Sequence, residues 1–321
     1  MSRPLVFMFS GQGSQYYQMG RELFERQPAY RGWMLRGEEV VRSISGRSIL
    51  GELYSETRKK SDPFNQVVCT HPALFMLGYA LARTLLEGGD RPDYLLGASL
   101  GELTALCVAG CLSFEETLTL ITRQAEFLHQ HRPAGGGMLA VFAPVSLYEK
   151  SRGIARRVTL CAVYFDEAFV VSGSAPLLDQ YEAELTAMSV LYQRLPITQG
   201  FHSPEIDDMK GFYLGLVERT TLRPASIPVI SCASAAVIRD ASPSHLWDII
   251  RSPIRFQETI RQQEAAGSFD YVDLGPSGSL ANFVKYNLQP GSQSHIHNLL
   301  TPFGQDWRNL ERLRSELRAR R

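Results

Sequence analysis

The chain has 321 residues, which is enough for one large domain or for a domain that carries an insert. Hydrophobic residues make up 44% of it and charged residues 21%, as in a globular protein with a packed core. Its 33 basic and 33 acidic residues cancel, which argues against a broad surface for nucleic acid or for anionic membranes. Because no apolar run approaches the length of a membrane span, we expect a cytoplasmic protein.

The cysteines are odd in number and scattered through apolar surroundings, which favours reduced core thiols over disulfides. Two of them, Cys107 and Cys111, are one helical turn apart, but no group of histidines completes a zinc site around them. We therefore expect no bound metal. The five cysteines are Cys69, Cys107, Cys111, Cys161 and Cys232.

The first predicted element is a short strand, Leu5 to Phe9, whose fully apolar sequence is typical of a strand buried in a parallel sheet. A glycine-rich turn, Gly11 to Gln15, follows and lacks the spacing of a P-loop or of a dinucleotide-binding fingerprint. Helix-permissive sequence runs to about Lys60. An apolar helix is then predicted from about Pro72 to Leu86, before a second strand at Tyr94 to Leu96.

This second strand leads into Gly97-Ala98-Ser99-Leu100-Gly101, which matches the G-x-S-x-G pattern of a nucleophile elbow. The residues from Glu102 onward are typical of a helix, whose N-terminal N–H groups would point at the serine. Taken alone, the pentapeptide fits an ordinary strand-to-helix turn about equally well. The strand before it and the helix after it favour the elbow.

A helix is predicted from Phe114 to Gln130, and the breaker Pro133 to Gly137 ends it. Short strands and one helix then indicate a small α+β insert, before buried strands resume the large domain. We therefore predict a large α/β domain from residues 1–134 and 199–321 and a small subdomain from residues 135–198. The elements behind this division are strands at Met138–Phe142, Val158–Val163, Phe169–Ser172, Pro228–Ser231 and Tyr271–Leu274, and a helix at Ala175–Met188.

A serine nucleophile needs a base, and His202 is the histidine best placed to be one. It lies in a loop after the insert, between Gly200 and Pro204, where a side chain is presented rather than packed. His71 and His245 flank predicted helices and are expected to pack or cap, whereas His129, His131, His295 and His297 lie in polar or loop-like stretches. An alternative triad, Ser99, Asp273 and His297, has the chain order of an α/β-hydrolase but leaves the Gly11 to Gln15 turn without a role.

With these motifs in place, almost the whole chain resembles the malonyl-CoA:acyl-carrier-protein transacylases and the acyltransferase domains of polyketide synthases. The resemblance is strongest to their freestanding, trans-acting members that act as acyl-carrier-protein hydrolases. The motifs that carry it are GQGSQ (Gly11–Gln15), GASLGE (Gly97–Glu102), GGML (Gly136–Leu139), VVSG (Val170–Gly173), GFHSP (Gly200–Pro204), SPIRF (Ser252–Phe256) and DLGPSGSL (Asp273–Leu280).

The resemblance implies an α/β-hydrolase-like domain with a parallel sheet, an inserted ferredoxin-like subdomain, and a site in the cleft between them. It implies Ser99 as nucleophile and His202 as base, with a backbone carbonyl near Ile249, four residues before Pro253, orienting the imidazole. The backbone N–H groups of Gln12 and Leu100 would form the oxyanion hole. No cofactor is expected, because the phosphopantetheine arm of an acyl carrier protein carries the substrate.

Other positions implied to contact the substrate include Gln199 and Phe201, just before His202. Two further positions depart from the family pattern: Ala98 replaces a histidine before the nucleophile, and Tyr164 replaces an asparagine in the insert. The third departure is Gln124, at the position where malonyl-loading members carry an arginine that pairs with the substrate carboxylate. Arg123 is the alternative partner, although a shift of one residue rotates a helical side chain by about 100°.

From this resemblance we predict an acyl-carrier-protein thioester hydrolase that acts in trans, as a monomer, on a polyketide or mixed peptide–polyketide assembly line. A glutamine in place of the arginine would admit plain acyl chains and leave the acyl-serine open to water. One alternative is a transacylase that loads malonyl or plain acyl units onto the carrier protein. Another is a catalytically silent subunit that only docks carrier proteins.

Overall fold

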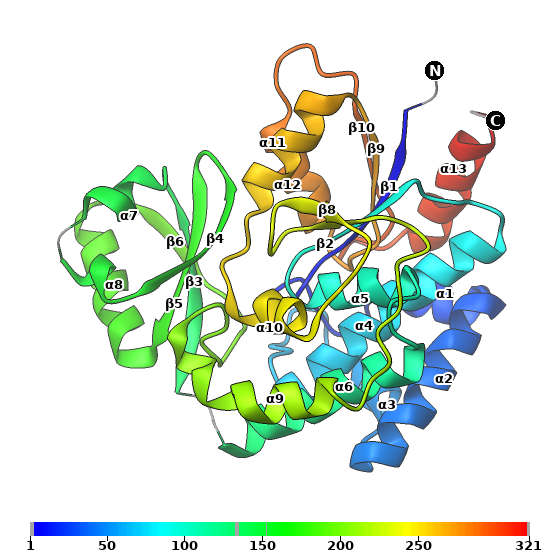
Figure 1. Cartoon of the computed structure of the whole chain (residues 1–321), viewed down its shortest axis with the longest axis horizontal. Coiled ribbons are helices and arrows are strands. Elements are labelled where there is room, and N and C mark those ends of the chain that lie inside the picture. Colours follow the sequence, from blue (N-terminus) through cyan, green and yellow to red (C-terminus); the bar gives the residue numbers. More distant parts are fainter. Residues whose placement is uncertain (1–2, 132–134, 152, 320–321) are drawn as a thin grey trace.

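The computed structural model describes residues 3–131, 135–151 and 153–319, and it contains two β-sheets (Figure 1). Pro133 and Ala134 of the predicted helix breaker lie outside the described residues. The larger sheet has the strand order β10-β9-β1-β2-β7-β8, in which β8 alone is antiparallel to its neighbour. Its strands are β1 (Leu5–Phe9), β2 (Tyr94–Gly97), β7 (Val229–Ser231), β8 (Ala236–Ile238), β9 (Asp270–Asp273) and β10 (His295–Asn298).

Helices cover this sheet, and their apolar sides form one continuous core with it (Figure 1). Every residue of β1 is buried, as its apolar sequence predicted. The helices are α1 (Arg21–Arg26), α2 (Pro28–Ser45), α3 (Ile49–Leu53), α4 (Val67–Glu87), α5 (Leu100–Val108), α6 (Phe114–His131), α9 (Lys210–Val217), α10 (Pro243–Arg251), α11 (Phe256–Ala266), α12 (Ser279–Asn287) and α13 (Asp306–Arg318), with a short 3-10 helix η2 at Pro204–Met209.

The apolar helix α4 begins at Val67, five residues before the predicted start at Pro72. A proline inside a helix lacks the N–H that would bond to the carbonyl four residues earlier, so the prediction placed it at the first turn. Instead the helix continues through Pro72, because burial of Val67 and Val68 in the core favours the longer helix.

The second sheet is antiparallel and has the order β4-β5-β3-β6. With its helices it forms the β-α-β-β-α-β succession of a ferredoxin-like unit, which confirms the predicted fold class. The sequence analysis missed the edge strand β6, a short element of mixed polar and apolar residues that is partly exposed. The elements are β3 (Gly136–Phe142), α7 (Ser146–Lys150), η1 (Ile154–Arg156), β4 (Thr159–Phe165), β5 (Ala168–Ser174), α8 (Ala175–Ala187) and β6 (Leu191–Arg194).

Hydrogen bonds connect the second sheet to the segment that follows α10 and to the end of α12. The Ile254 N–H donates to the carbonyl of Cys161 (2.8 Å), and the Asn287 side chain donates to the carbonyl of Tyr164 (2.7 Å). Both acceptors lie on β4, so this strand is fixed against the part of the chain that carries α11 and α12. This connection sets the spacing of the residues that face each other between the two sheets.

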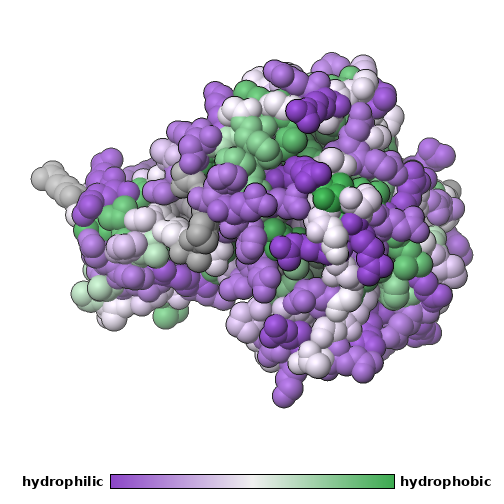
Figure 2. Space-filling view, turned by 90° about the horizontal axis from the view of Figure 1, so that it is seen from below, coloured by the Kyte–Doolittle hydropathy of each residue, from purple (hydrophilic) through white to green (hydrophobic). Residues whose placement is uncertain are grey.

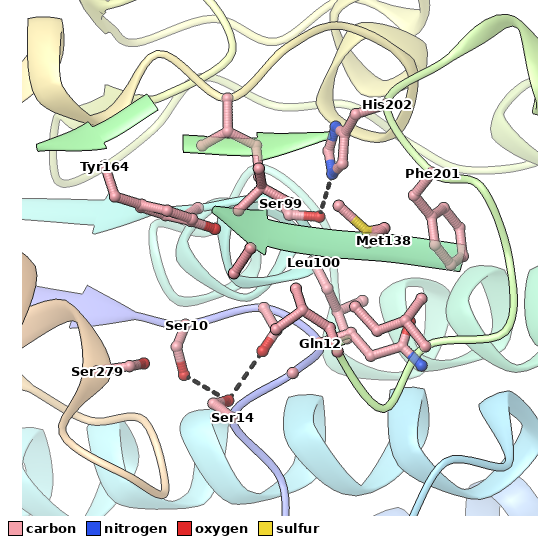
Figure 3. Close-up of a pocket in the computed structure, with 18 of the residues that line it drawn as sticks. Ser10, Gln12, Ser14, Ser99, Leu100, Met138, Tyr164, Phe201, His202 and Ser279 are labelled. Atoms are coloured by element: carbon pink, nitrogen blue, oxygen red, sulfur yellow. Dashed lines mark hydrogen bonds between the residues drawn. The ribbon is translucent and has the colours of Figure 1, made fainter. Parts of the chain in front are cut away.

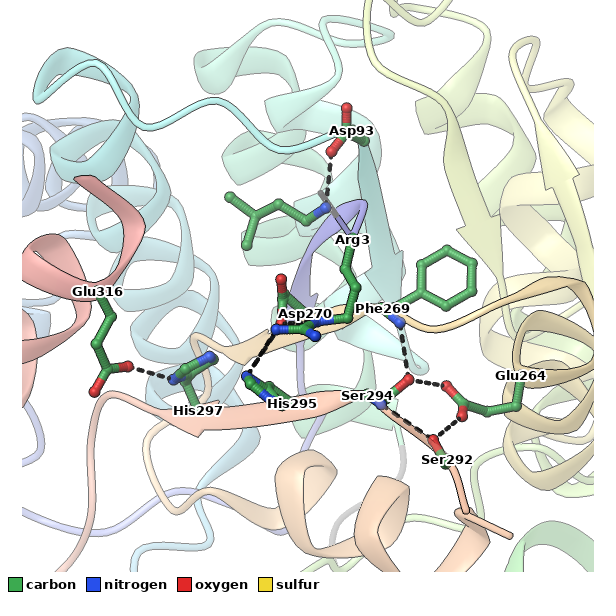
Figure 4. Close-up of polar contacts among 11 residues, drawn as sticks. Arg3, Asp93, Glu264, Phe269, Asp270, Ser292, Ser294, His295, His297 and Glu316 are labelled. Atoms are coloured by element: carbon green, nitrogen blue, oxygen red, sulfur yellow. Dashed lines mark hydrogen bonds and ion pairs between the residues drawn. The ribbon is translucent and has the colours of Figure 1, made fainter. Parts of the chain in front are cut away.

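The histidines near the C-terminal end lie on the edge strand β10, which the sequence analysis did not predict (Figure 4). His295 Nδ1 is 3.0 Å from Arg3 Nη2, and Arg3 in turn pairs with the buried Asp270 on β9. His297 pairs with Glu316 of α13 at 3.1 Å. These contacts join the edge of the sheet to the two ends of the described chain.

Hydrophilic side chains cover most of the face shown in Figure 2, with hydrophobic ones gathered in smaller patches. None of the helices within residues 3–131, 135–151 and 153–319 has both the length and the apolar character needed to cross a membrane. All five cysteines are buried and unpaired, as the sequence predicted.

Gly101, in the first turn of α5, lies where this helix packs closely against β1, so a substitution there tests the packing. A Cβ atom there would lie 1.9 Å from the backbone oxygen of Phe9, which the sheet holds in place. We expect Gly101→Ala to lower the free energy of unfolding by about 3 kcal/mol, measured by chemical denaturation.

Gly215 in α9 is the matched control, because a Cβ there meets no atom within 4 Å. Gly215→Ala should raise the free energy of unfolding by up to about 1 kcal/mol through helix propensity. Equal effects at the two glycines would contradict the close approach of α5 to β1.

Candidate active site

The sharp turn between β2 and α5 presents Ser99. Its backbone has φ 55° and ψ −129°, a conformation uncommon for a residue with a side chain. The turn needs Gly97, because a Cβ there would lie 2.2 Å from Cα of Glu102. The Ala98 N–H donates to the carbonyl of Phe9 (3.1 Å), which fixes the turn against the end of β1. Strand, turn and helix are thus arranged as the G-x-S-x-G pattern predicted.

The Ser99 hydroxyl lies 2.8 Å from Nε2 of His202, although 103 residues separate the two in sequence (Figure 3). Nδ1 of the same ring is 2.7 Å from the carbonyl oxygen of Ser252. A carbonyl can only accept, so Nδ1 carries the proton and Nε2 presents a lone pair. The Ser99 hydroxyl therefore donates to Nε2, which is the arrangement a general base needs.

The carbonyl that orients the imidazole belongs to Ser252, and the prediction of Ile249 was wrong. The family resemblance had implied a carbonyl four residues before Pro253. Instead Ile249 lies within α10, and the helix continues to Arg251. Ser252 then turns to an extended conformation (ψ 156°), which directs its carbonyl at His202. The carbonyl of Ile250 accepts from the His202 backbone N–H instead (3.1 Å).

His202 is buried, with 1% of its surface exposed, and burial lowers its pKa to about 4. The nearby Arg251 charge lowers the pKa further, whereas the hydrogen bond to Ser252 raises it. Because this pKa lies below the ordinary 6.5, the ring is neutral at pH 7 and can accept a proton.

Leu100 is the first residue of α5, and the N–H groups in the first turn of a helix have no partner within the helix. Gln12 lies in the turn after β1, which packs closely against the elbow. A Cβ at the neighbouring Gly11 would lie 2.9 Å from the carbonyl oxygen of Ala98. Both Leu100 and Gln12 line the cavity in front of Ser99 (Figure 3). Their N–H groups are the candidate donors to an oxyanion.

The dyad faces a cavity of about 260 Å³ between the two sheets (Figure 3). Its walls are mainly apolar, and among the described residues no aspartate, glutamate, lysine or arginine lines it. The lining side chains from the second sheet and the loop after it are those of Met138, Ala140, Phe142, Tyr164, Ala168, Phe169, Val170, Gln193, Leu195, Ile197 and Phe201. The large domain contributes Ser10, Gln12, Ser14, His71, Ala98, Leu100, Gln124, Ile250, Ile254, Ser279, Leu280 and Phe283.

Gln124 of α6 is 1% exposed and lines this cavity, and within the described part of the chain neither of its amide atoms has a hydrogen-bond partner. Arg123 points elsewhere: it is absent from the lining, its side chain is 46% exposed, and it pairs with Glu126 at 2.9 Å. The helix register therefore gives the cavity a neutral amide rather than a guanidinium.

Of the other predicted substrate contacts, Ala98, Tyr164 and Phe201 line the cavity. The Tyr164 ring stacks on Phe283, with ring centroids 4.2 Å apart. Gln199 does not line the cavity, and its role as a substrate contact stays a prediction. It is buried just before the His202 loop, and its position in sequence next to lining residues did not show which way its side chain points.

The sequence analysis missed His71, which it assigned to packing or capping. His71 lies inside α4, lines the cavity, and has Nε2 2.9 Å from Oε1 of Gln12. An amide oxygen can only accept, so Nε2 carries the proton, and burial lowers the pKa of the ring to about 3. The one sequence signal that could have identified His71 as a site residue is its position beside Pro72 in a mainly apolar helix.

The structure does not support the alternative triad of Ser99, Asp273 and His297. The Asp273 carboxylate accepts from the backbone N–H groups of Gly275 (2.8 Å) and Ala281 (2.9 Å). His297 pairs with Glu316, on the far side of β9 from β1 (Figure 4). Neither residue lines the cavity that holds Ser99.

The lowered pKa of His202 predicts how the reactivity of Ser99 depends on pH. A fluorophosphonate probe should label Ser99 at nearly the same rate at pH 5.5 and pH 7.5. With an ordinary histidine pKa of about 6.5, the rate would be about tenfold lower at pH 5.5. The rate should be lost only as the pH falls through about 4, because protonation of Nε2 then removes the base.

His202→Ala is the control, since it should label slowly at both pH values, and circular dichroism should show folded protein throughout. A tenfold loss of the wild-type rate between pH 7.5 and 5.5 would contradict the lowered pKa.

Comparison with known proteins agrees with this geometry. Residues 6–317 match the family model for the acyl transferase domain. The chain is 38% identical to "Polyketide biosynthesis acyltransferase homolog BaeD" of Bacillus velezensis (99% of this chain, 98% of that protein) and 36% identical to "Polyketide biosynthesis acyltransferase homolog PksD" of Bacillus subtilis (97% and 95%). The solved acyl transferase domain of SpnD, in complex with 2-(pent-4-yn-1-yl)malonyl, superimposes with a TM-score of 0.87 at 29% identity, covering 98% of this chain and 76% of that one. This chain belongs to the acyl transferase domain family.

Proposed function

We propose that this protein hydrolyses acyl thioesters carried by acyl carrier protein, through an acyl-enzyme on Ser99. The observation that carries the proposal is the Ser99–His202 pair facing a cavity that offers the buried amide of Gln124 and no cation among the described lining residues. Such a cavity suits an uncharged acyl chain. It would hold the free carboxylate of a malonyl group poorly, because a buried charge needs a partner.

In the first half of the reaction, His202 Nε2 takes the Ser99 proton while Oγ attacks the thioester carbonyl carbon. The oxyanion forms near the N–H groups of Leu100 and Gln12. When the C–S bond breaks, His202 returns the proton to the leaving thiolate. In the second half, His202 takes a proton from water, whose oxygen attacks the acyl-serine. The collapse releases the free acid and restores the serine hydroxyl.

The relatives support the pathway of this proposal. BaeD and PksD are both named as acyltransferase homologues of polyketide biosynthesis, and this chain covers nearly their whole length. We therefore propose the phosphopantetheine thioesters of a polyketide acyl carrier protein as substrates and the carrier protein as partner. No step of the reaction needs a further cofactor.

The second candidate is transfer of the acyl group to another carrier thiol, which membership of the family favours. The two activities share the acyl-serine and differ in whether water or a thiol attacks it. An amide in place of a cation leaves the acyl group without an ionic anchor, so water competes for it. A silent docking subunit is the weaker candidate, since it would not need a hydrogen-bonded dyad with a lowered histidine pKa.

The first prediction concerns the acyl-enzyme itself. Incubation with acetyl-carrier protein should add an acetyl mass to the wild-type protein and release free acetate. Ser99→Ala should show neither adduct nor release, because it removes the nucleophile that is hydrogen-bonded to His202. His202→Ala should lower the rate by about 10²–10⁴-fold, the contribution of a general base.

His297→Ala is the matched histidine control and should keep the wild-type rate. The measurement is mass spectrometry of the intact enzyme, with free acid followed in the presence and absence of an acceptor carrier protein. Transfer to the acceptor with no free acid would support the transacylase instead, and no adduct at all would support docking.

The second prediction concerns Gln124. Gln124→Arg places a guanidinium in the cavity and should raise malonyl-serine formation by about 10–100-fold, the range of a charge-assisted hydrogen bond. The same change should slow acetyl and longer acyl chains, which would then face a buried charge. Arg123→Ala should leave the preference unchanged, since Arg123 faces away from the cavity. A wild-type malonyl preference that Arg123→Ala abolishes would overturn the assignment of Gln124.

A further inference from the structure

The cavity holds buried polar atoms that the dyad and the oxyanion hole do not use. They are Nε2 and Oε1 of Gln124 and Nδ1 of His71, and within the described part of the chain none of the three has a hydrogen-bond partner. Both side chains line the cavity, and their exposed fractions are 1% and 2%. Buried polar atoms are nearly always paired in folded proteins. Three unpaired atoms on two side chains that line one cavity therefore point to a polar group of the ligand.

We propose that the cavity selects acyl chains that carry a hydroxyl group, which hydrogen-bonds to Gln124 and to Nδ1 of His71. The inference deepens the proposed function and rests on it, since it names the class of acyl thioester that the Ser99 site receives.

The donor and acceptor roles of these atoms determine which group fits. His71 donates through Nε2 to Oε1 of Gln12, so its Nδ1 presents a lone pair and can only accept. Burial lowers the pKa of this ring to about 3, so Nδ1 stays unprotonated at neutral pH. Gln124 offers a donor in its NH₂ group and an acceptor in its oxygen. The cavity thus presents two kinds of acceptor and one donor group.

A hydroxyl can use the donor group and one of the two acceptors. Its proton goes to Nδ1 of His71 or Oε1 of Gln124, and its oxygen accepts from Nε2 of Gln124. A ketone can only accept, so it would pair with Nε2 and leave both acceptors unsatisfied. A carboxylate would bring two negative oxygens against those same lone pairs. A methylene would pair with none of them and would displace any water that satisfies them.

The test compares thioesters that differ at one carbon. Butyryl, 3-hydroxybutyryl, 3-oxobutyryl and malonyl groups are loaded on the same acyl carrier protein, and kcat/KM is measured for acylation of Ser99 and for release of free acid. The 2-hydroxy and 4-hydroxy isomers are included to locate the hydroxyl along the chain. We expect at least one hydroxybutyryl thioester to exceed butyryl by about 10–100-fold, the effect of pairing buried polar groups, with 3-oxobutyryl between them and malonyl lowest.

The variant arm removes the amide. Gln124→Leu should fold, because it replaces unpaired buried polar atoms with an apolar side chain of similar size. It should bring the preference for the hydroxybutyryl thioester close to one, chiefly by raising the rate with butyryl. Gln130→Leu, on the exposed last turn of the same helix and outside the cavity, should keep the wild-type preference. Circular dichroism of both variants checks the fold.

Equal rates for every hydroxybutyryl isomer and butyryl in the wild type would overturn the proposal and would mean that water alone satisfies these atoms. A preference that survives Gln124→Leu would overturn the role of Gln124. Neither result touches the proposed function, which fails only if no thioester acylates Ser99 or releases free acid. Failure of the inference and failure of the hydrolase assignment are therefore distinguishable.

Discussion

The site depends on the hydrogen bond between Ser99 and His202. Both residues have backbone conformations that are disfavoured for residues with a side chain, so the structure around them must hold them in place. Their φ angles are 55° and 57°, in the left-handed region that glycine fills most easily. Such positions persist only where the surroundings determine them. Here the end of β1 and the start of α5 hold Ser99, while Ile250 in the last turn of α10 holds the His202 backbone and Ser252, just after the helix, holds its ring.

Helix α10 connects the two halves of the dyad. His245 in its first turn lies 2.9 Å from Oε1 of Glu102, which is fully buried in the helix that follows Ser99. At the other end of α10, Ser252 accepts from the His202 ring. A helix C-terminus carries partial negative charge, which favours the imidazolium that forms when His202 takes the serine proton. One helix therefore fixes the orientation of the base relative to the nucleophile.

The sequence was enough to predict the elements whose pattern is local. The apolar strand β1, the elbow around Ser99 and a small α+β insert follow from periodicity and motifs, whereas the ferredoxin-like class of the insert was implied by the family resemblance. What it could not supply was the direction of individual groups in irregular segments: the orienting backbone carbonyl belongs to Ser252 rather than Ile249, and Gln199 does not line the cavity. His71 was missed because its role depends on a contact with Gln12, 59 residues away in sequence.

The neutrality of the described cavity lining bears both on the charges that form in turnover and on the class of substrate. Burial keeps the His71 and His202 rings neutral at neutral pH, Gln124 is neutral, and the other described lining residues carry no charge. The resting cavity is therefore uncharged, and the charges that arise in turnover are the oxyanion and the imidazolium that the fold is arranged to receive. A fixed cation beside them would repel the imidazolium, and a substrate carboxylate would repel the oxyanion. A neutral cavity with unpaired donor and acceptor atoms on Gln124 and His71 avoids both effects, and it leaves hydrogen bonding as the means to distinguish one acyl chain from another.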